Sequence, residues 1–274
     1  LYNSLLPNSP FRFDVTVRLV EVAARHDELS VISSHIAAID SLVQEWGMSL
    51  EQTRQLYVLL SDTFKEKPTG RREAYESAIK LISTYTEPPF AASVQERAIE
   101  CVAMAVRAPE VFNFEEVHAL PAVRAIQKSH PMCQLLQVFL DGDLAAYLKW
   151  SKDHSSELGQ YKLSDDDNIR KMRILTLITV TGRHVPGKVD YKTIAKALEI
   201  NESEVEVWVI DAIRLNLLDA KMDQLTKSVQ VRRTTYREFK LQQWKALSLH
   251  LEIWRKNLGD VATVLQQAKQ MTNV

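Results

Sequence analysis

Residues 189–235 read VDYKTIAKALEINESEVEVWVIDAIRLNLLDAKMDQLTKSVQVRRTT, and this stretch decides the fold class. It begins with a short extended piece at Val189, which is followed by a helical pattern over 191–198. Asn201 then precedes a second helical pattern over 202–216, so a side chain suited to capping stands directly before the first turn. Two helices separated by so short a turn predict a helix-turn-helix unit.

Two strand-like segments complete the pattern, over 217–225 and 228–235. In the second segment Val229 and Val231 alternate with polar side chains, which is the period of a half-buried strand. Helix, turn, helix and β-hairpin in this order predict a winged helix, which we place at 186–236.

On the N-terminal side, the chain reads as successive helices with short joints. Gly and Pro number only seven and nine, and Pro falls mostly between periodic segments. Successive helix pairs of roughly 40 residues indicate a structural repeat. We therefore expect residues 1–185 to form a right-handed helical-repeat solenoid, which makes the protein mainly α. The expected helices cover about 10–24, 32–46, 49–66, 70–86, 91–107, 114–129, 132–141, 143–158 and 164–181.

The last segment, 237–274, is the most regular part of the sequence. Its apolar side chains are spaced alternately three and four residues apart, as in the seam of a coiled coil. The seam residues are Trp244, Leu247, Leu251, Trp254, Leu258, Val261, Leu265 and Ala268. A helix of this length would span roughly 50 Å, well past a winged helix. We therefore expect the distal half to join a helical bundle with partners; the alternative is a solvated helix end weakened by Gly259.

The distribution of charged residues indicates whether the winged helix is suited to bind nucleic acid or protein. The chain has 34 basic and 35 acidic side chains, so no overall field draws it to nucleic acid or to an anionic membrane. Residues 202–216 carry three Glu and one Asp against Arg214 alone, and such a helix would repel phosphates. A local basic cluster remains at Arg232, Arg233 and Arg237. We expect it to lie at a protein contact along a strand edge, with an RNA contact as the alternative.

The sequence contains no recognisable set of catalytic or metal-binding residues. The seven histidines are scattered without metal-ligand spacing, and the glycine-rich phosphate and nucleophile motifs are absent. Cys101 and Cys133 stand among apolar residues, as core side chains in a reducing compartment do. Asp165, Asp166 and Asp167 fit the cap of a helix, and the basic group 170–173 fits a solvated helix rim. We expect a non-enzymatic protein without cofactor or metal.

The sequence also predicts a cytoplasmic protein. No apolar run approaches the roughly 20 residues that cross a bilayer, and residues 1–7 lack the regions of a signal peptide. The chain does not start with Met, which predicts native sequence before Leu1.

The helical repeat, the winged helix and the closing helix together resemble the PCI family. Members of that family build the proteasome lid, the signalosome and eukaryotic translation initiation factor three. The segment Met222-Asp223-Gln224 is similar to a hairpin found across the family. Three more stretches resemble the initiation-factor members in particular: KMRILT at 171–176, VIDAIR at 209–214 and QQW at 242–244.

The resemblance implies a non-catalytic scaffold subunit of the initiation-factor complex. In this family winged helices join side by side through their sheets, and C-terminal helices gather into a bundle. The implied partners are the large PCI subunit a and the MPN-type subunits, with the small ribosomal subunit contacted indirectly. A subunit of the proteasome lid or signalosome is the alternative within the family, and an RNA-binding winged-helix module is the alternative from another class.

Overall fold

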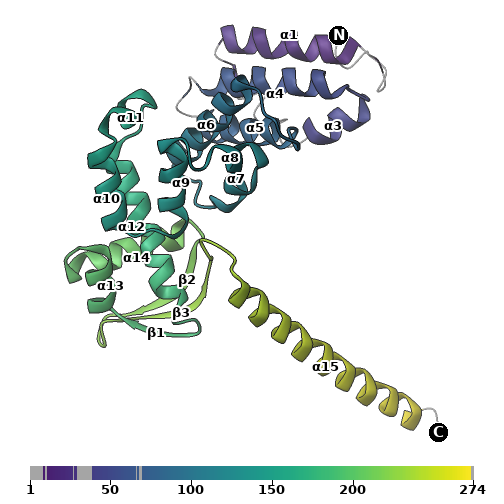
Figure 1. Cartoon of the computed structure of the whole chain (residues 1–274). Helices are drawn as coiled ribbons and strands as arrows, with labels where there is room; N and C mark the ends of the chain where they lie inside the picture. Colours follow the sequence, from purple (N-terminus) through teal and green to yellow (C-terminus); the bar gives the residue numbers. More distant parts are fainter. Residues whose placement is uncertain are drawn as a thin grey trace. The chain divides into compact units, whose positions relative to one another are not determined.

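The computed structural model describes residues 9, 11–26, 28–29, 39–65, 67 and 70–272 of the chain. The chain divides into two compact units, Leu1–Arg237 and Glu238–Val274. The expected helical-repeat and winged-helix segments, 1–185 and 186–236, lie together in the first unit. The second unit contains a single long helix, α15 (Leu241–Thr272), drawn in yellow-green in Figure 1.

Helices form the N-terminal part of the first unit, and their order follows the expected repeat. The helix expected over 32–46 is described only from Ile39 onward, and Ile32 and Ile36 lie outside the described residues. The described helices are α1 (Phe11–Arg25), α3 (Ile39–Glu45), α4 (Leu50–Lys65), α5 (Arg71–Ser83), α6 (Ala92–Arg107), α7 (Glu115–Ala119), α8 (Pro121–Ile126), α9 (Pro131–Asp141), α10 (Leu144–Asp153), α11 (Ser155–Gln160) and α12 (Asp165–Gly182).

Two helices that we expected to be continuous are broken. The segment 114–129 divides into α7 and α8 at Leu120, which has the extended conformation that a following proline imposes. Pro121 then opens α8, where its missing N–H costs no helical hydrogen bond. The segment 143–158 divides into α10 and α11 at His154, whose φ of −128° is not helical and whose ring stacks on Trp150.

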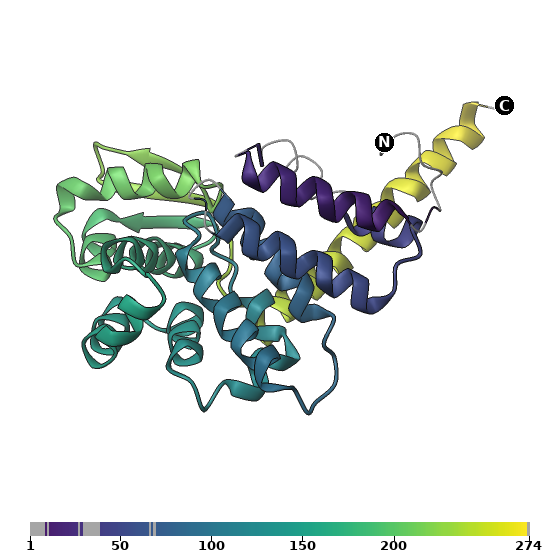
Figure 2. The same cartoon turned by 90° about the horizontal axis from the view of Figure 1, so that it is seen from above.

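The helices of the repeat pack as neighbouring pairs. Helix α4 pairs with α5, α5 packs on α6, and α1 lies alongside α4 (Figures 1 and 2). One buried apolar cluster runs through these helices. Its largest members include Phe114, Phe139 and Tyr147, with ring centroids 5.1 Å apart in the first pair and 6.0 Å apart in the second. This continuous core makes the repeat one body.

The winged helix has the predicted order of elements. It comprises β1 (Gly187–Asp190), α13 (Tyr191–Leu198), a 3-10 turn (Glu202–Glu204), α14 (Val205–Arg214), β2 (Leu218–Asp223) and β3 (Ser228–Thr234). The antiparallel sheet has the order β1-β3-β2, with Val189 and Met222 both opposite Val229. Asn201 and Glu204 form a reciprocal capping box ahead of α14. The mainly α fold, with a helical repeat followed by a winged helix, is confirmed.

Helix α12 links the repeat to the winged helix. It packs on α6 and α10 of the repeat and on α13, α14 and β3 of the winged helix. Met172 and Leu175 belong to the core of the repeat, whereas Leu177 belongs to the core of the winged helix. A helix that is apolar on several faces is buried on several sides, and here that joins the two modules into one unit.

Candidate interaction surfaces

Helix α15 starts with an aromatic contact. Phe239 lies two residues before the helix, and its ring meets that of Trp244 edge-on, with centroids 4.8 Å apart. These positions correspond to a hydrophobic staple, in which a residue before the cap packs on one in the first turns. Part of the Trp244 ring therefore serves to set the start of the helix.

The predicted seam of α15 is exposed along its described length. These side chains retain between 40% and 70% of their surface: Trp244, Leu247, Leu251, Trp254, Leu258, Val261 and Leu265. The side chain of Ala268 lies outside the described part. Burying a large apolar side chain stabilises by about 1.5–3 kcal/mol, so a continuous row of exposed ones is a candidate interaction surface. The contact that this surface makes stays a prediction.

A second apolar row lies on another face of α15. Leu249 and Ile253 are four residues apart, and each is two residues, about 200° around the helix, from a seam leucine. Val264 follows three turns beyond Ile253 on the same face. All three are exposed, at 57%, 47% and 62%. We missed this row because we followed only the heptad seam. The signal was present, since Leu249, Ile253 and Val264 are separated by four and eleven residues, which places them on one face of a helix.

A bulge in the winged-helix sheet brings two predicted arginines to one face. Asp219 pairs with Arg233 and Ala220 with Val231, so Arg232 is the extra residue of β3. At such a bulge two consecutive side chains can face the same side, and Arg232 and Arg233 are both exposed. The solvent face of the sheet thereby acquires a pair of cations.

The strand register adds two lysines to that face. Gln230 of β3 stands opposite Lys188 of β1 and Lys221 of β2, and all three are exposed. This row could not be read from the sequence, because Lys188 and Lys221 are far apart along the chain. They come close to Gln230 only because β1 and β2 are the two edge strands on either side of β3. Whether the face meets a protein or RNA stays a prediction.

Helix α14 is unlike a helix that reads DNA. Its exposed face includes apolar Val207 and Ile210, at 61% and 43% exposure. Glu206 accepts hydrogen bonds from Tyr191 and from Gln224, and Asp211 forms an ion pair of 2.7 Å with Arg170. Apolar and acidic groups of this kind offer little to bases or phosphates.

Arg237 is not an exposed cation, which corrects its expected place in the basic cluster. Its guanidinium donates to the carbonyls of Val138, Phe139 and Gly142, at distances between 2.7 and 3.2 Å. These groups close the C-terminal end of α9, where carbonyls lack helical partners. A Cβ on Gly142 would lie 2.7 Å from the Val138 oxygen, so the tight closure requires glycine. Burial lowers the pKa of Arg237 to about 10, so it remains charged at neutral pH.

Lys171 is likewise buried, although its basic segment was expected to be a solvated rim. Its Nζ donates to the carbonyls of Ala105, Val106 and Ala108 at 3.0, 2.9 and 2.5 Å, which caps the end of α6. Burial lowers the pKa of Lys171 to about 7. The apolar neighbours at 172 and 174–175 were the available signal for burial.

The other two cations of that segment connect α12 to α14. Arg170 pairs with Asp211, and the guanidinium carbon of Arg173 lies 5.5 Å from the centre of the Trp208 ring. The stretches 171–176 and 209–214, which carry the family resemblance, belong to the two helices, α12 and α14, that pack on each other at the joint between repeat and winged helix.

The described residues offer nothing that resembles a catalytic centre. No group of three or more His, Cys, Asp or Glu within the described ranges could hold a metal. Burial raises the pKa of Cys101 to about 12 and that of Cys133 to about 11, which disfavours the reactive thiolate. Within the same ranges, no helix is both long and apolar enough to pass through a bilayer.

The fold and its joint define a class of protein: a helical repeat that is fused through one shared helix to a winged helix. A family model described as "PCI domain" matches residues 152–233, from the end of α10 to β3. The curated proteins provide closer relatives. One from Dictyostelium discoideum is 33% identical over 98% of this chain and 67% of its own length. One from Chaetomium globosum is 30% identical over 98% of this chain and 64% of its own length.

A third relative, from Aedes aegypti, is 31% identical over 94% of this chain and 65% of its own length. All three are named eukaryotic translation initiation factor 3 subunit M. The chain belongs to this family, which confirms the resemblance. It spans about two thirds of the length of the relatives that it matches.

Proposed function

We propose that the chain is a non-catalytic scaffold subunit of the translation initiation factor 3 complex and that α15 carries it into that complex. Its family membership supports the first part. The observation that carries the second part is the 32-residue helix with exposed apolar rows on two faces. A helix with two such faces can be buried between two neighbours, as an inner helix of a bundle is.

The remaining assignments follow from the same scaffold role. The partners are the large PCI subunit a and the MPN-type subunits, and the small ribosomal subunit is reached through them. The compartment is the cytoplasm. Strand β2 is an edge of the sheet and offers the unpaired backbone groups through which a neighbouring winged helix can extend it.

The test is incorporation of the tagged full chain into its native complex, read by identifying the proteins purified with it. Wild type should recover initiation factor 3 subunits, and the Trp254→Asp, Leu258→Asp double variant should not. Both side chains are more than half exposed, so circular dichroism and the unfolding midpoint of the isolated variant should match wild type.

Lys245→Asp with Lys256→Asp is the matched control. It changes the charge of α15 more strongly but alters neither apolar row, and it should incorporate normally. Recovery of proteasome lid or signalosome subunits with wild type would reject the complex assignment. Normal incorporation of the Trp254, Leu258 variant would reject the role of the seam.

A further inference from the structure

Two adjoining hollows lie along one face of α6 in the helical repeat. Their volumes are about 620 and 400 Å³, and both are lined by Glu100 and Tyr161. Among the α6 residues that line them, five recur every three or four positions along one side of the helix: Ser93, Arg97, Glu100, Met104 and Arg107. We call this surface the α6 groove. A helix of 16 residues is about 24 Å long, enough for roughly seven residues of extended peptide.

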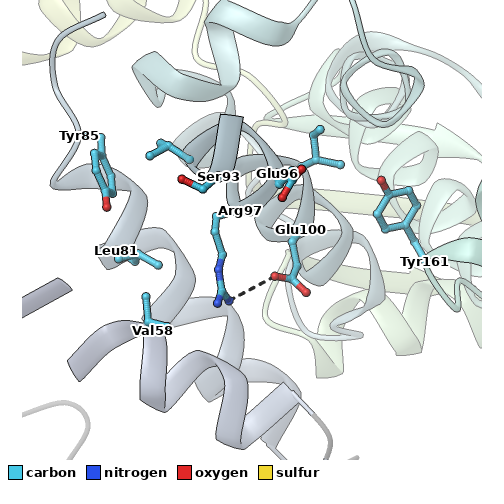
Figure 3. Close-up of a pocket in the computed structure, with 10 residues that line it drawn as sticks. Val58, Leu81, Tyr85, Ser93, Glu96, Arg97, Glu100 and Tyr161 are labelled. Carbon is cyan, nitrogen blue, oxygen red and sulfur yellow. Dashed lines mark hydrogen bonds and ion pairs between the residues drawn. The ribbon is translucent and has the colours of Figure 1, made fainter. Parts of the chain in front are cut away.

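One half of the α6 groove has an aliphatic wall that includes Val58 and Leu81, and the charged side chains of Glu96, Arg97 and Glu100 also line it. Figure 3 shows Val58, Leu81 and Tyr85 on one side of Arg97 and Tyr161 on the other. A guanidinium already covers Tyr85, because the carbon of Arg54 lies 3.8 Å from the ring centre. The aliphatic wall thus remains for an apolar side chain, while that face of the tyrosine ring is unavailable for stacking.

The other half is strongly basic. Among the described residues that line it there are five cations and one carboxylate, that of Glu100; the cations are Lys65, Lys67, Arg71, Arg107 and Lys162. The whole chain has a net charge of only −1, so this is a local concentration of positive charge. Among the residues that the structure describes, no carboxylate forms an ion pair with Arg71 or Lys162.

Side-chain contacts hold the α6 groove in shape. Arg97 donates to both carboxylate oxygens of Asp62, at 2.5 and 2.9 Å, and also contacts Glu100 at 3.4 Å. Glu100 pairs in addition with Lys65, which neutralises the one acid of the basic half. Arg107 donates to the carbonyl of Tyr161 and so fixes the segment that carries Lys162. Arg71 of α5 and Lys162, which follows α11, therefore line the basic half of a preformed site from two different parts of the chain.

We propose that the α6 groove binds an acidic peptide segment of a partner protein, with an apolar side chain in the first half and carboxylates in the second. The positive charge of the basic half favours a ligand with negatively charged groups. The aliphatic wall of the other half favours a ligand that also carries an apolar side chain. Nucleic acid fits less well, because single-stranded binding uses aromatic platforms, and the Tyr85 face is occupied. This inference concerns a different surface from the two used in the proposed function and does not depend on them.

The test is selection from a phage-displayed library of random 12-residue peptides on the immobilised full chain. Peptides enriched by wild type should combine apolar residues with two or more neighbouring acids. In fluorescence anisotropy with such a peptide, Arg71→Glu with Lys162→Glu should weaken binding by about tenfold or more, since two attractive pairs become repulsive. Ser93→Trp should weaken binding as well. Ser93 is exposed and lines the first half of the groove, so the larger side chain would occupy the space of the peptide's apolar residue.

The matched control is Lys192→Glu with Lys196→Glu, the same charge change on exposed lysines of α13, and it should bind as wild type does. A peptide with its acids replaced by Lys should bind the Arg71, Lys162 variant better than it binds wild type. The proposal fails if selection enriches nothing, or if enriched peptides lack acids. It also fails if the Arg71, Lys162 variant binds the acidic peptide normally, or if only a 12-nucleotide polyuridine RNA binds and loses affinity in that variant.

Discussion

Lys171 and Arg237 have the same structural role at two places in the first unit: each caps the C-terminal end of a helix. Each is a basic side chain that donates hydrogen bonds to backbone carbonyls at the C-terminal end of a repeat helix, α6 for Lys171 and α9 for Arg237. Carbonyls at the end of a helix generally lack helical partners and carry the negative end of the helix dipole, so a buried basic side chain can donate to them. Hydrogen bonds to charged groups are stronger than neutral ones, so we expect both residues to contribute more to stability than the burial of their own surface does.

Replacing Arg237 by Ala should lower the free energy of unfolding by about 2–4 kcal/mol, because several buried carbonyls lose a charged donor. Arg233→Ala is the matched control and should change the free energy of unfolding by less than about 0.5 kcal/mol, since Arg233 is exposed on the sheet. Urea unfolding of the isolated chain measures both. Equal effects of the two variants would contradict the capping role.

Lys171 should make stability depend on pH. Burial lowers its pKa to about 7 in the folded protein, below the ordinary value of 10.5. Between these values the unfolded chain binds more protons, so the free energy of unfolding rises with pH by on the order of 1 kcal/mol per unit. Below about pH 7 both states hold the proton and the contribution is flat.

The measurement for Lys171 is the difference in free energy of unfolding between wild type and Lys171→Met from pH 6 to 10. Other titrating groups cancel in this difference, which should move in favour of wild type above pH 7. A flat difference across the range would show that the three carbonyls keep the amine protonated.

At the scale of elements, α15 differs from the helices of the first unit that have ten or more residues in having no described buried residue. The buried residues of the other long helices reflect packing within one core, whereas α15 exposes both apolar rows. Its single staple, between Phe239 and Trp244, orders only the first turns. An isolated helix is marginal without tertiary packing, so we expect partners to complete it.

The two rows of α15 predict two different contacts in the assembled complex. Leu249→Asp with Ile253→Asp should weaken incorporation while leaving the isolated chain folded, because the second row would meet a different neighbour from the seam. Crosslinking from each row in the native complex should identify two distinct partner helices. Crosslinks to one and the same helix from both rows would contradict this arrangement.

At the scale of the molecule, the chain is one unit up to Arg237 and another beyond it. The first unit owes its continuity to α12, which contributes side chains to both cores. The charged contacts of Arg170, Lys171 and Arg173 reinforce the same joint. We therefore expect repeat and winged helix to unfold together.

A chain ending at Lys240 should fold and keep the unfolding midpoint of the full chain, because it retains the Arg237 cap and loses only the second unit. The same truncation with Arg237→Ala is the matched variant and should melt at a lower temperature. Calorimetry should show one transition for the truncated chain. Two resolved transitions would mean that repeat and winged helix are independent.

Much of the fold could be predicted from the sequence because the local residue patterns agree with the way these segments pack in the structure. Alternating valines in β3, the Asn201 cap and the heptads of α15 each carry their pattern in neighbouring residues, and all were predicted. The breaks at Leu120 and His154 were missed because helical periodicity continues across them. The roles of Lys171 and Arg237 were missed because their acceptors lie 63 to 66 and 95 to 99 residues away along the chain.

The sequence by itself determined the winged helix, the helical repeat, the apolar seam of α15 and the family resemblance. These features rest on hydrophobic periodicity and charge patterns among residues that are close in the sequence, so they can be recognised without knowing the distant contacts. Only the tertiary structure decided which cations are buried, which strands border β3, and that α6 lines a groove with an aliphatic wall in one half and a group of cations in the other. The physical reason is that burial and charge clustering depend on residues brought together from distant segments, and their spacing along the chain does not encode that proximity.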